Sequence, residues 1–344
     1  MNERADAIAA LESGRPTLIW RQQLADLDTP IGAALKLVEP GRGDFILESV
    51  EGGNVRGRYT YIGLAPDLVF RAEGATAAIN RRWEDDREAF APADDDSVGA
   101  LRVLVEECRM DLPDGLPQSL ACLVGYFGYE TIGLIEDLPR PPENPLELPD
   151  MLFVRPTLIL IFDRLEDRLH LVAPIWSAGD QAPEKAVDKA VERIETAAAR
   201  LAAPYLPRHR KVTELPEVAP QSMVSSDDYK RMVDTAKDYI AAGDIFQVVL
   251  AQRFTQPFPL PPVDLYRALR RINPSPFLYY LDLPGFALIG SSPEILVRER
   301  DGEVTIRPIA GTRPRGQTAS EDAANRESLL ADPKERAEHL MLLD

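Results

Sequence analysis

The sequence has few cysteines, no long apolar run and a deficit of basic residues. Its two cysteines, Cys108 and Cys122, are too few for a disulfide framework and too far apart for a zinc ribbon. No run approaches 18 uncharged apolar residues, and the first residues contain no apolar signal-peptide core, which predicts a cytoplasmic protein without a membrane span. With 39 basic against 56 acidic residues, the formal net charge is -17. This charge argues against nucleic acid and anionic membranes as partners, because phosphate binding needs a basic face.

The 344 residues are enough for about two domains with buried cores, and 45% of them are hydrophobic. Four prolines, at positions 204, 207, 216 and 220, mark the main interruption of the pattern. We therefore predict an N-terminal region over residues 1–203, a linker over 204–224 and a second region over 225–344. Strand patterns typical of antiparallel pairing alternate with helical ones, which indicates the α+β class.

Hydrophobic spacing and capping residues predict the individual elements. Ser225 with Asp228 suggests a capping box for a helix that ends at Gly243. Asp332 and Pro333 are typical of the start of another helix, and no stop signal follows before Asp344, so we expect the intact protein to continue. We further predict helices over 30–37, 97–110, 186–201 and 263–272, an antiparallel meander over 45–50, 58–63 and 67–71, and strands over 120–126, 151–162, 169–174, 243–253, 277–283 and 286–289.

The densest chemistry lies between residues 290 and 316. Asp301-Gly302 separates two runs rich in β-branched residues, which predicts a two-residue hairpin turn pairing Arg300 with Glu303. This register places Glu299 opposite Val304 and one apolar face toward the core. The core face would carry Ile295, Val297, Val304 and Ile306, and the opposite face Glu294, Arg298, Arg300, Thr305 and Arg307.

This window also has the local charge that an acidic ligand requires. From Glu294 to Gly316 five arginines meet four acids, a net charge of +1 within a strongly acidic chain. Glycine at 311 allows the backbone to approach a ligand, and arginine at 313 can bind a carboxylate with two hydrogen bonds. We therefore expect a substrate with a carboxylate. The alternative is a hairpin with a solvated arginine face.

Two blocks in this window carry a family resemblance. The segments GSSPE at 290–294 and PIAGTRPRG at 308–316 resemble the signatures of the chorismate-utilising enzymes, and most closely those of anthranilate synthase component I. The blocks GYFGYE at 125–130 and GDIFQVVLAQR at 243–253 are also similar to the family. The resemblance implies a layered α/β/β/α fold with two packed, largely antiparallel sheets, incomplete at the C-terminus of this chain.

The resemblance also implies an activity and its residues. Such an enzyme converts chorismate and ammonia into anthranilate and pyruvate, with magnesium as Lewis acid. The family pattern assigns catalytic positions to Glu294 and Thr312, substrate contacts to Gly311 and Thr312, and a magnesium ligand to Glu338. Without the family, Glu335 and Glu338 would be interpreted as a solvated acidic helix face. Further family blocks, with a second metal carboxylate and a catalytic histidine, are absent here, so we expect this chain alone to bind magnesium poorly and to be inactive.

A second implied site concerns feedback inhibition by tryptophan. The block LES at 47–49, followed by RYTYIG at 58–63, is similar to the region that carries this site in the family. The resemblance assigns to it Ser49, Pro276, Phe277 and Leu278. From the sequence alone, the favoured interpretation of Ser49 is a strand-end serine with a satisfied hydroxyl group.

Two positions favour one member of the family. Relatives that add water to the ring typically carry a lysine base at the position of Gln247. Aminodeoxychorismate synthases typically carry a lysine nucleophile at the position of Ala310. Because this chain has neither lysine, ammonia is the expected nucleophile. The resemblance implies that a separate glutaminase subunit, component II, supplies the ammonia, since neither cysteine has a recognisable catalytic context. Two alternatives stay open: aminodeoxychorismate synthase component I, and a non-catalytic module that binds tryptophan or the glutaminase.

Overall fold

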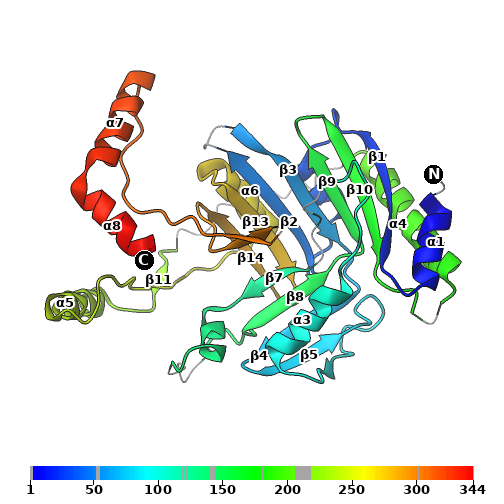
Figure 1. Ribbon diagram of the computed structural model, residues 1–344, viewed down its shortest axis with the longest axis horizontal. Coiled ribbons are helices and arrows are strands. Elements are labelled where there is room, and N and C mark those ends of the chain that lie inside the picture. The colour runs from blue at the N-terminus through cyan, green and yellow to red at the C-terminus, as the bar shows by residue number, and fades with distance from the viewer. Residues whose placement is uncertain are drawn as a thin grey trace. The chain divides into compact units, whose positions relative to one another are not determined.

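The structure is a computed structural model that describes residues 3–51, 55–117, 120, 123–138, 144–179, 181–205, 218–300 and 302–343 (Figure 1). The chain divides into two compact units. Unit 1 comprises Met1–Tyr205 and Pro262–Asp344, and unit 2 comprises Leu206–Pro261. Most of the predicted linker, residues 206–217, lies outside the described residues.

Unit 1 contains the larger sheet, sheet A, whose neighbouring strands are all antiparallel. Its order in the described chain is β1-β10-β9-β3-β2-β13-β14. The predicted regions 1–203 and 225–344 therefore both contribute strands to it. The bounds are β1 (Thr17–Leu24), β2 (Asp44–Glu51), β3 (Val55–Leu64), β9 (Leu158–Asp163), β10 (Arg168–Ile175), β13 (Phe277–Leu283) and β14 (Phe286–Ser292).

Sheet B, also in unit 1, corrects two sequence predictions. The third strand of the predicted meander, β4 (Leu68–Glu73), does not pair with β3 but joins sheet B, because Ala65 takes a positive φ of 49° and Pro66 cannot donate to a ladder. Residues 151–162 form two strands instead of one, separated at Pro156, and these belong to different sheets. The order of sheet B is β6 (Ala91–Pro92), β5 (Thr76–Asn80), β4, β8 (Met151–Arg155) and β7 (Val124–Phe127).

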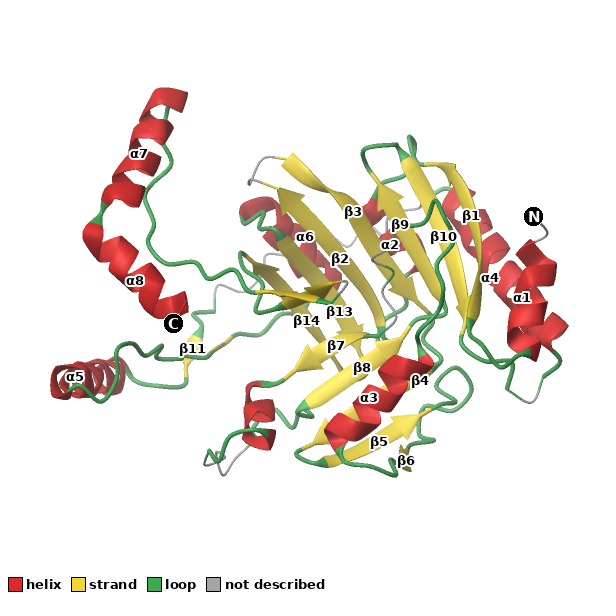
Figure 2. Cartoon of the chain, in the orientation of Figure 1, coloured by secondary structure: helices red, strands yellow, loops and turns green. Residues whose placement is uncertain are grey.

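Four layers follow from how the two sheets and the helices pack (Figure 2). One face of sheet A packs against helices through a core that includes Ile46, Leu160 and Tyr266. Its other face packs against sheet B through residues such as Phe45 and Val154. A third cluster lies between sheet B and α3. The predicted α/β/β/α layering of an α+β protein is confirmed. The helices are α1 (Glu3–Glu12), α2 (Pro30–Leu37), α4 (Pro183–Ala202) and α6 (Pro262–Ile272) on sheet A, and α3 (Ser97–Glu107) on sheet B.

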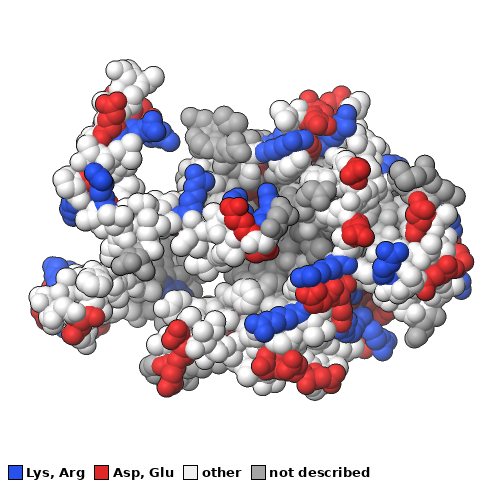
Figure 3. Space-filling model, in the orientation of Figure 1, with Lys and Arg blue, Asp and Glu red and all other residues white. Residues whose placement is uncertain are grey.

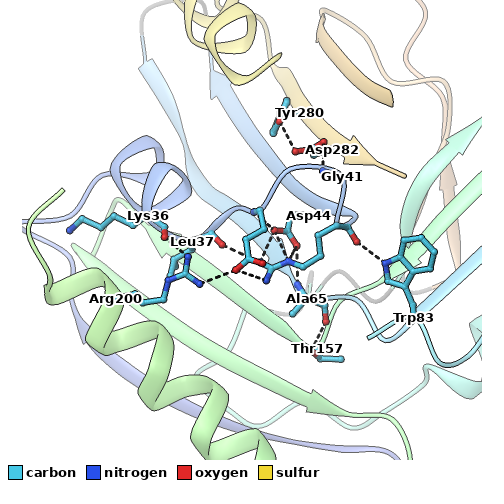
Figure 4. A network of polar contacts seen from close by, with 12 residues as sticks. Lys36, Leu37, Gly41, Asp44, Ala65, Trp83, Thr157, Arg200, Tyr280 and Asp282 are labelled. Atoms are coloured by element: carbon cyan, nitrogen blue, oxygen red, sulfur yellow. Dashed lines mark hydrogen bonds and ion pairs between the residues drawn. The ribbon is translucent and has the colours of Figure 1, made fainter. Parts of the chain in front are cut away.

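A polar network ties the loop at residues 38–43 to the sheets (Figure 4). The fully buried Asp44 accepts hydrogen bonds from Arg42 Nη2 at 2.7 Å and from the backbone N–H of Ala65 at 2.9 Å. Burial raises the pKa of Asp44 against the opposing effect of Arg42. Asp282, directly opposite in the β2–β13 register, accepts from the N–H of Gly41 and from the Tyr280 hydroxyl. These contacts satisfy carboxylates that would otherwise be costly to bury.

Unit 2 confirms one prediction and contradicts another. Helix α5 (Ser226–Ala242) begins after Ser225, whose Oγ accepts from the N–H of Asp228, and ends at Gly243 with φ of 83°. The predicted buried strand over 243–253 is wrong: Phe246 is 84% exposed and Val249 is 85% exposed. A strand needs a neighbour, and no described strand pairs with these residues. The two short strands of the unit are β11 (Gln221–Ser222) and β12 (Phe254–Thr255), which pair with each other.

The remaining elements belong to unit 1 and include α7, a helix that, like α1, was not predicted. Thr318 caps α7 by accepting from the N–H of Glu321 at 3.2 Å, a capping-box pattern that the sequence does contain. No helix in the described chain is both long and apolar enough to cross a membrane. On the face seen in Figure 3, basic and acidic side chains are interspersed. The elements are η1 (Tyr129–Leu134), β15 (Arg298–Arg300), β16 (Glu303–Thr305), α7 (Ala319–Ala331) and α8 (Pro333–Leu343).

Candidate functional site

The two signature blocks meet through Glu294. The first block continues from the end of β14, and the second follows β16. Glu294 Oε1 accepts a hydrogen bond from the backbone N–H of Ile309 at 2.9 Å, and Ser292 Oγ donates to the carbonyl of Glu294 at 3.0 Å. Residues separated by 15 positions are thereby joined, so that Glu294 lies at the base of the loop over residues 310–317.

The hairpin between the blocks has the predicted register but not the predicted core face. Arg300 pairs with Glu303 and Glu299 with Val304, and Gly302 takes a φ of 78°, while Asp301 lies outside the described residues. Val304 is nevertheless 67% exposed, and Val297 and Ile306 are also exposed. The reason is that β15 and β16 form a separate two-stranded sheet, and no described element of unit 1 covers either face.

Gly311 and Thr312 lie on the loop, beside the first turn of α8. A Cβ atom at Gly311 would lie 1.8 Å from Glu335 Oε2, so a larger residue would require the Glu335 side chain to move. Thr312 is exposed, and its carbonyl accepts from Arg313 Nη1 at 3.0 Å. The loop thus presents an exposed threonine next to a glycine that is closed on one side by a helix carboxylate.

The loop arginines do not match their predicted role as free carboxylate binders. Arg313 donates to Glu335 Oε1 at 3.1 Å and to Asp332 Oδ2 at 2.8 Å, and Arg315 donates to Asp322 Oδ2 at 2.9 Å. Both guanidinium groups therefore hold the helices that follow the loop. The cations left for a substrate carboxylate are the exposed Arg298, Arg300 and Arg307, for which the described residues show no ion pair.

Glu338 lies one turn beyond Glu335 on α8 and is half-buried. No cluster of three or more His, Cys, Asp or Glu side chains is present among the described residues. The donor set still fits magnesium, because this ion is commonly held by one or two carboxylates and completes its octahedron with water and substrate oxygens. Glu338 would hold it, whereas Glu335 is engaged by Arg313. We call Glu294, Gly311, Thr312 and Glu338 the loop site.

The residues assigned to tryptophan binding meet within sheet A. Ser49 of β2 lies directly opposite Phe277 of β13, and we call this pair the strand site. Both belong to the strand positions that face sheet B, since Phe45 and Leu281 have the same parity and pack there. Leu278, only 2% exposed, packs on the opposite face against the helices, and Pro276 precedes β13. The structure therefore brings Ser49 and Phe277 together but turns Leu278 away from them.

The pairing of β2 with β3 is irregular at Ser49. Glu48 pairs with Thr60 whereas Val50 pairs with Arg56, so three residues of β3, 57–59, lie opposite Ser49 alone. A Cβ atom at Gly57 would lie 1.6 Å from Ser49 Oγ. Bulges of this kind redirect side chains and are frequent beside functional sites. Gly57 is thus the residue that makes room for the Ser49 hydroxyl group.

Next to Ser49, Glu48 is the centre of a buried ion cluster on the helix side of sheet A. Its carboxylate, 3% exposed, contacts Arg270 Nη2 and Arg164 Nη2, both at 2.6 Å, and accepts from the Tyr266 hydroxyl at 3.1 Å. Burial opposes the ionisation of Glu48, but the two guanidinium groups outweigh it and keep its pKa below the usual range. The cluster fixes β2 to α6, which leads into residues 273–276.

Sequence reasoning missed Gly57, the Glu48 cluster and the acidic partners of Arg313. The partners of Arg313 could have been predicted, because Asp332 and Glu335 lie together at a helix start, where carboxylates are expected. The other two could not be predicted, since Gly57 depends on a shift in the β2–β3 register and the Glu48 cluster depends on how Arg164 and α6 lie beside β2.

Comparisons with known proteins agree with the signatures. The family model described as chorismate binding enzyme matches residues 51–344. "Anthranilate synthase component 1" of Cereibacter sphaeroides is 46% identical over 335 residues, which cover 97% of this chain and 67% of the relative. The protein of the same description from Pseudomonas putida is 39% identical over 329 residues, covering 94% and 65%. The chain spans about two thirds of the length of these relatives.

Solved structures have the same fold. Anthranilate synthase component I from Streptococcus pneumoniae superposes with a TM-score of 0.67 at 28% identity, over 94% of this chain and 66% of that one. The menaquinone-specific isochorismate synthase from Escherichia coli gives a TM-score of 0.59 at 17% identity, over 99% and 67%, which is a likeness of fold alone.

Proposed function

Because the chain belongs to the chorismate-binding enzyme family, we propose that it is the chorismate-binding part of an anthranilate synthase component I. The observation that carries this proposal is its 46% identity, over 97% of its length, to a relative of that description. The reaction combines chorismate and ammonia to give anthranilate, pyruvate and water. The lack of a lysine at Gln247 and at Ala310 supports ammonia as the nucleophile.

The loop site provides groups for binding and proton transfer. Gly311 and Thr312 contact the substrate through backbone N–H groups and a hydroxyl group, because the loop is exposed on the side away from Glu335. In its protonated form, Glu294 gives its proton to the C4 hydroxyl group, which leaves as water while ammonia bonds to C2 and the ring double bonds shift toward C4. The resulting Glu294 carboxylate then takes up the surplus proton of the nitrogen. The N–H of Ile309 holds this carboxylate at the base of the loop.

Glu338 would hold magnesium, which supplies positive charge next to the ring carboxylate when bound. The exposed arginines of the hairpin add positive charge for an anionic substrate in a chain of net charge -17. Ammonia comes from a separate glutaminase subunit, component II. Magnesium, ammonia and this subunit all belong to the proposal.

The strand site binds tryptophan as a feedback inhibitor. Ser49 and Phe277 lie side by side on the face of sheet A that packs on sheet B, and the irregular pairing leaves the Ser49 hydroxyl beside Gly57. Phe277 is 41% exposed, so its ring is accessible to an aromatic ligand.

The test measures anthranilate fluorescence with chorismate, ammonium and magnesium, with and without tryptophan. Since the chain spans two thirds of its relatives, it is assayed alone and fused to the remaining third of the Cereibacter sphaeroides relative. We expect fluorescence from the fusion that tryptophan suppresses. Ser49→Phe is expected to abolish the suppression and to leave ammonium-dependent turnover in place.

Each failure has a distinct meaning. Chorismate consumed without fluorescence would overturn the proposal in favour of aminodeoxychorismate synthase. Equal suppression in Ser49→Phe and the parent would refute the strand site. Thr312→Ala should lower turnover about tenfold or more by removing a substrate contact. Thr305→Ala, a matched change in β16, should not.

A further inference from the structure

Helix α8 has no buried residue in the part of the chain that the structure describes. Every one of its residues is at least partly exposed, and its principal neighbour in the described chain is α7, which also has no buried residue. Packing of an apolar face is what normally fixes a helix in a protein. Between the loop and α8, the described residues show polar contacts, and these can set how α8 is oriented toward the loop.

Arg313 supplies such contacts. It donates to Asp332 Oδ2 at 2.8 Å and to Glu335 Oε1 at 3.1 Å, and we call these three residues the Arg313 clamp. The planar guanidinium group has its donors in a fixed fork, so two carboxylates bound at once fix both the distance and the rotation of the helix start. Arg313 also donates to the carbonyl of Thr312, which ties the clamp to the loop itself.

The partners of Arg313 are themselves held by the helix. Asp332 Oδ1 accepts from the N–H groups of Lys334 and Glu335, and these bonds keep the pKa of Asp332 below its usual range. Glu335 lies against Gly311, where a larger residue would displace the Glu335 carboxylate from its present position. The clamp and this close approach therefore join the same loop and the same helix turn.

We propose that Arg313 is a positioning residue, which sets the rotation of α8 and so orients the Glu338 carboxylate toward the substrate loop. Glu338 and Glu335 are three residues apart and share a helix face, so a rotation of the helix that moves Glu335 also moves Glu338. The claim that Arg313 orients Glu338 rests on the proposed function. The claim that Arg313 sets the rotation of α8 does not depend on it.

The competing role for Arg313 is direct binding of a substrate carboxylate. In that case its loss would weaken substrate binding but leave α8 unchanged. Arg315 offers a matched control, because it lies on the same loop and pairs with Asp322 of α7. Its removal deletes an equal charge without touching α8.

The first experiment measures amide hydrogen exchange in the 344-residue chain without ligand. In Arg313→Ala, we expect the amides of α8 to exchange about tenfold or more faster than in the parent. In Arg315→Ala, α8 should be unchanged. Arg313→Lys should be intermediate, because an ammonium group keeps the charge but loses the fork. Parental exchange of α8 in Arg313→Ala would overturn the clamp.

The second experiment uses the fusion with the remaining third of the Cereibacter sphaeroides relative, because the chain alone is expected to bind magnesium poorly. It titrates Mn²⁺, an oxygen-preferring probe for the magnesium site, and follows the signal of free Mn²⁺ by electron paramagnetic resonance. We expect Arg313→Ala to weaken binding about tenfold or more, as changes around metal ligands commonly do, and Arg315→Ala to leave it unchanged. If Glu338→Gln binds Mn²⁺ as tightly as the parent, the proposed role of Glu338 is overturned. The hydrogen-exchange experiment would still show whether the Arg313 clamp orders α8. If Glu338→Gln loses Mn²⁺ binding but Arg313→Ala binds Mn²⁺ as tightly as the parent, the proposal that Arg313 orients Glu338 is overturned.

Discussion

The strand site and the loop site are held in place by different interactions. Ser49 and Phe277 lie in a sheet that is covered on both faces, and the adjacent Glu48 is 3% exposed. The loop site depends on hydrogen bonds and ion pairs at partly exposed residues, and its helix has no buried side chain. Buried contacts usually contribute more to stability than exposed ones. The comparison therefore predicts that changes near the strand site unfold the protein, while changes at the loop site alter local geometry.

The largest effect is expected from Glu48→Ala. The change removes the carboxylate that Arg164 and Arg270 contact in a largely buried setting. Breaking a buried ion pair from one side costs about 3–5 kcal/mol, and we expect a loss of unfolding free energy near the lower end of that range, because both arginines retain some exposure. Urea unfolding followed by circular dichroism measures it. Glu338→Gln, the matched change at the loop site, should cost less than about 0.5 kcal/mol.

The Glu48 carboxylate also leads us to predict how stability depends on pH. The folded-state pKa of Glu48 lies below its unfolded value, so its contribution to stability is present above the unfolded pKa of about 4.3 and is lost as pH falls through the folded pKa. The difference in unfolding free energy between the parent and Glu48→Ala should thus be constant from pH 7 to pH 5 and shrink below about pH 4. A difference that grows on acidification would contradict the cluster.

An intermediate effect is expected from Gly57→Ala. The added methyl group would lie within 1.6 Å of Ser49 Oγ and 3.0 Å of the Ser49 carbonyl carbon, so the backbone must shift. Overpacking of this kind costs about 1–3 kcal/mol. Under the proposed function the change should also abolish tryptophan inhibition, because the Ser49 hydroxyl group has to move. Gly133→Ala is the control, since a Cβ atom there meets nothing within 4 Å. Unaltered tryptophan inhibition in Gly57→Ala would mean that Ser49 takes no part in tryptophan binding.

The two regions also differ in how far the sequence could predict them. The α/β/β/α layering, the Ser225 cap and the hairpin register follow from local residues and from signature blocks, and the structure confirms them. Pairing of the neighbouring strands β2 and β3 was predicted, but the shift of their register at Ser49 leaves no local signal, so the contact of Ser49 with Gly57 could not be foreseen. The apolar pattern at Val304 correctly indicated a strand but not its burial, because alternation specifies a face and not what covers it.

The smallest effect tests that last distinction with one substitution at two strand positions. Val304→Thr in the hairpin changes a residue that is 67% exposed, whereas Val154→Thr in sheet B introduces a hydroxyl group at a fully buried site between the sheets. Threonine keeps the β-branched shape, so strand propensity is preserved in both. We expect Val304→Thr to change the unfolding free energy by less than about 0.5 kcal/mol. Val154→Thr should cost about 1–3 kcal/mol for a buried hydroxyl group. Equal costs in urea unfolding would mean that a surface in the protein covers the hairpin face, and the contrast between the two regions would no longer hold.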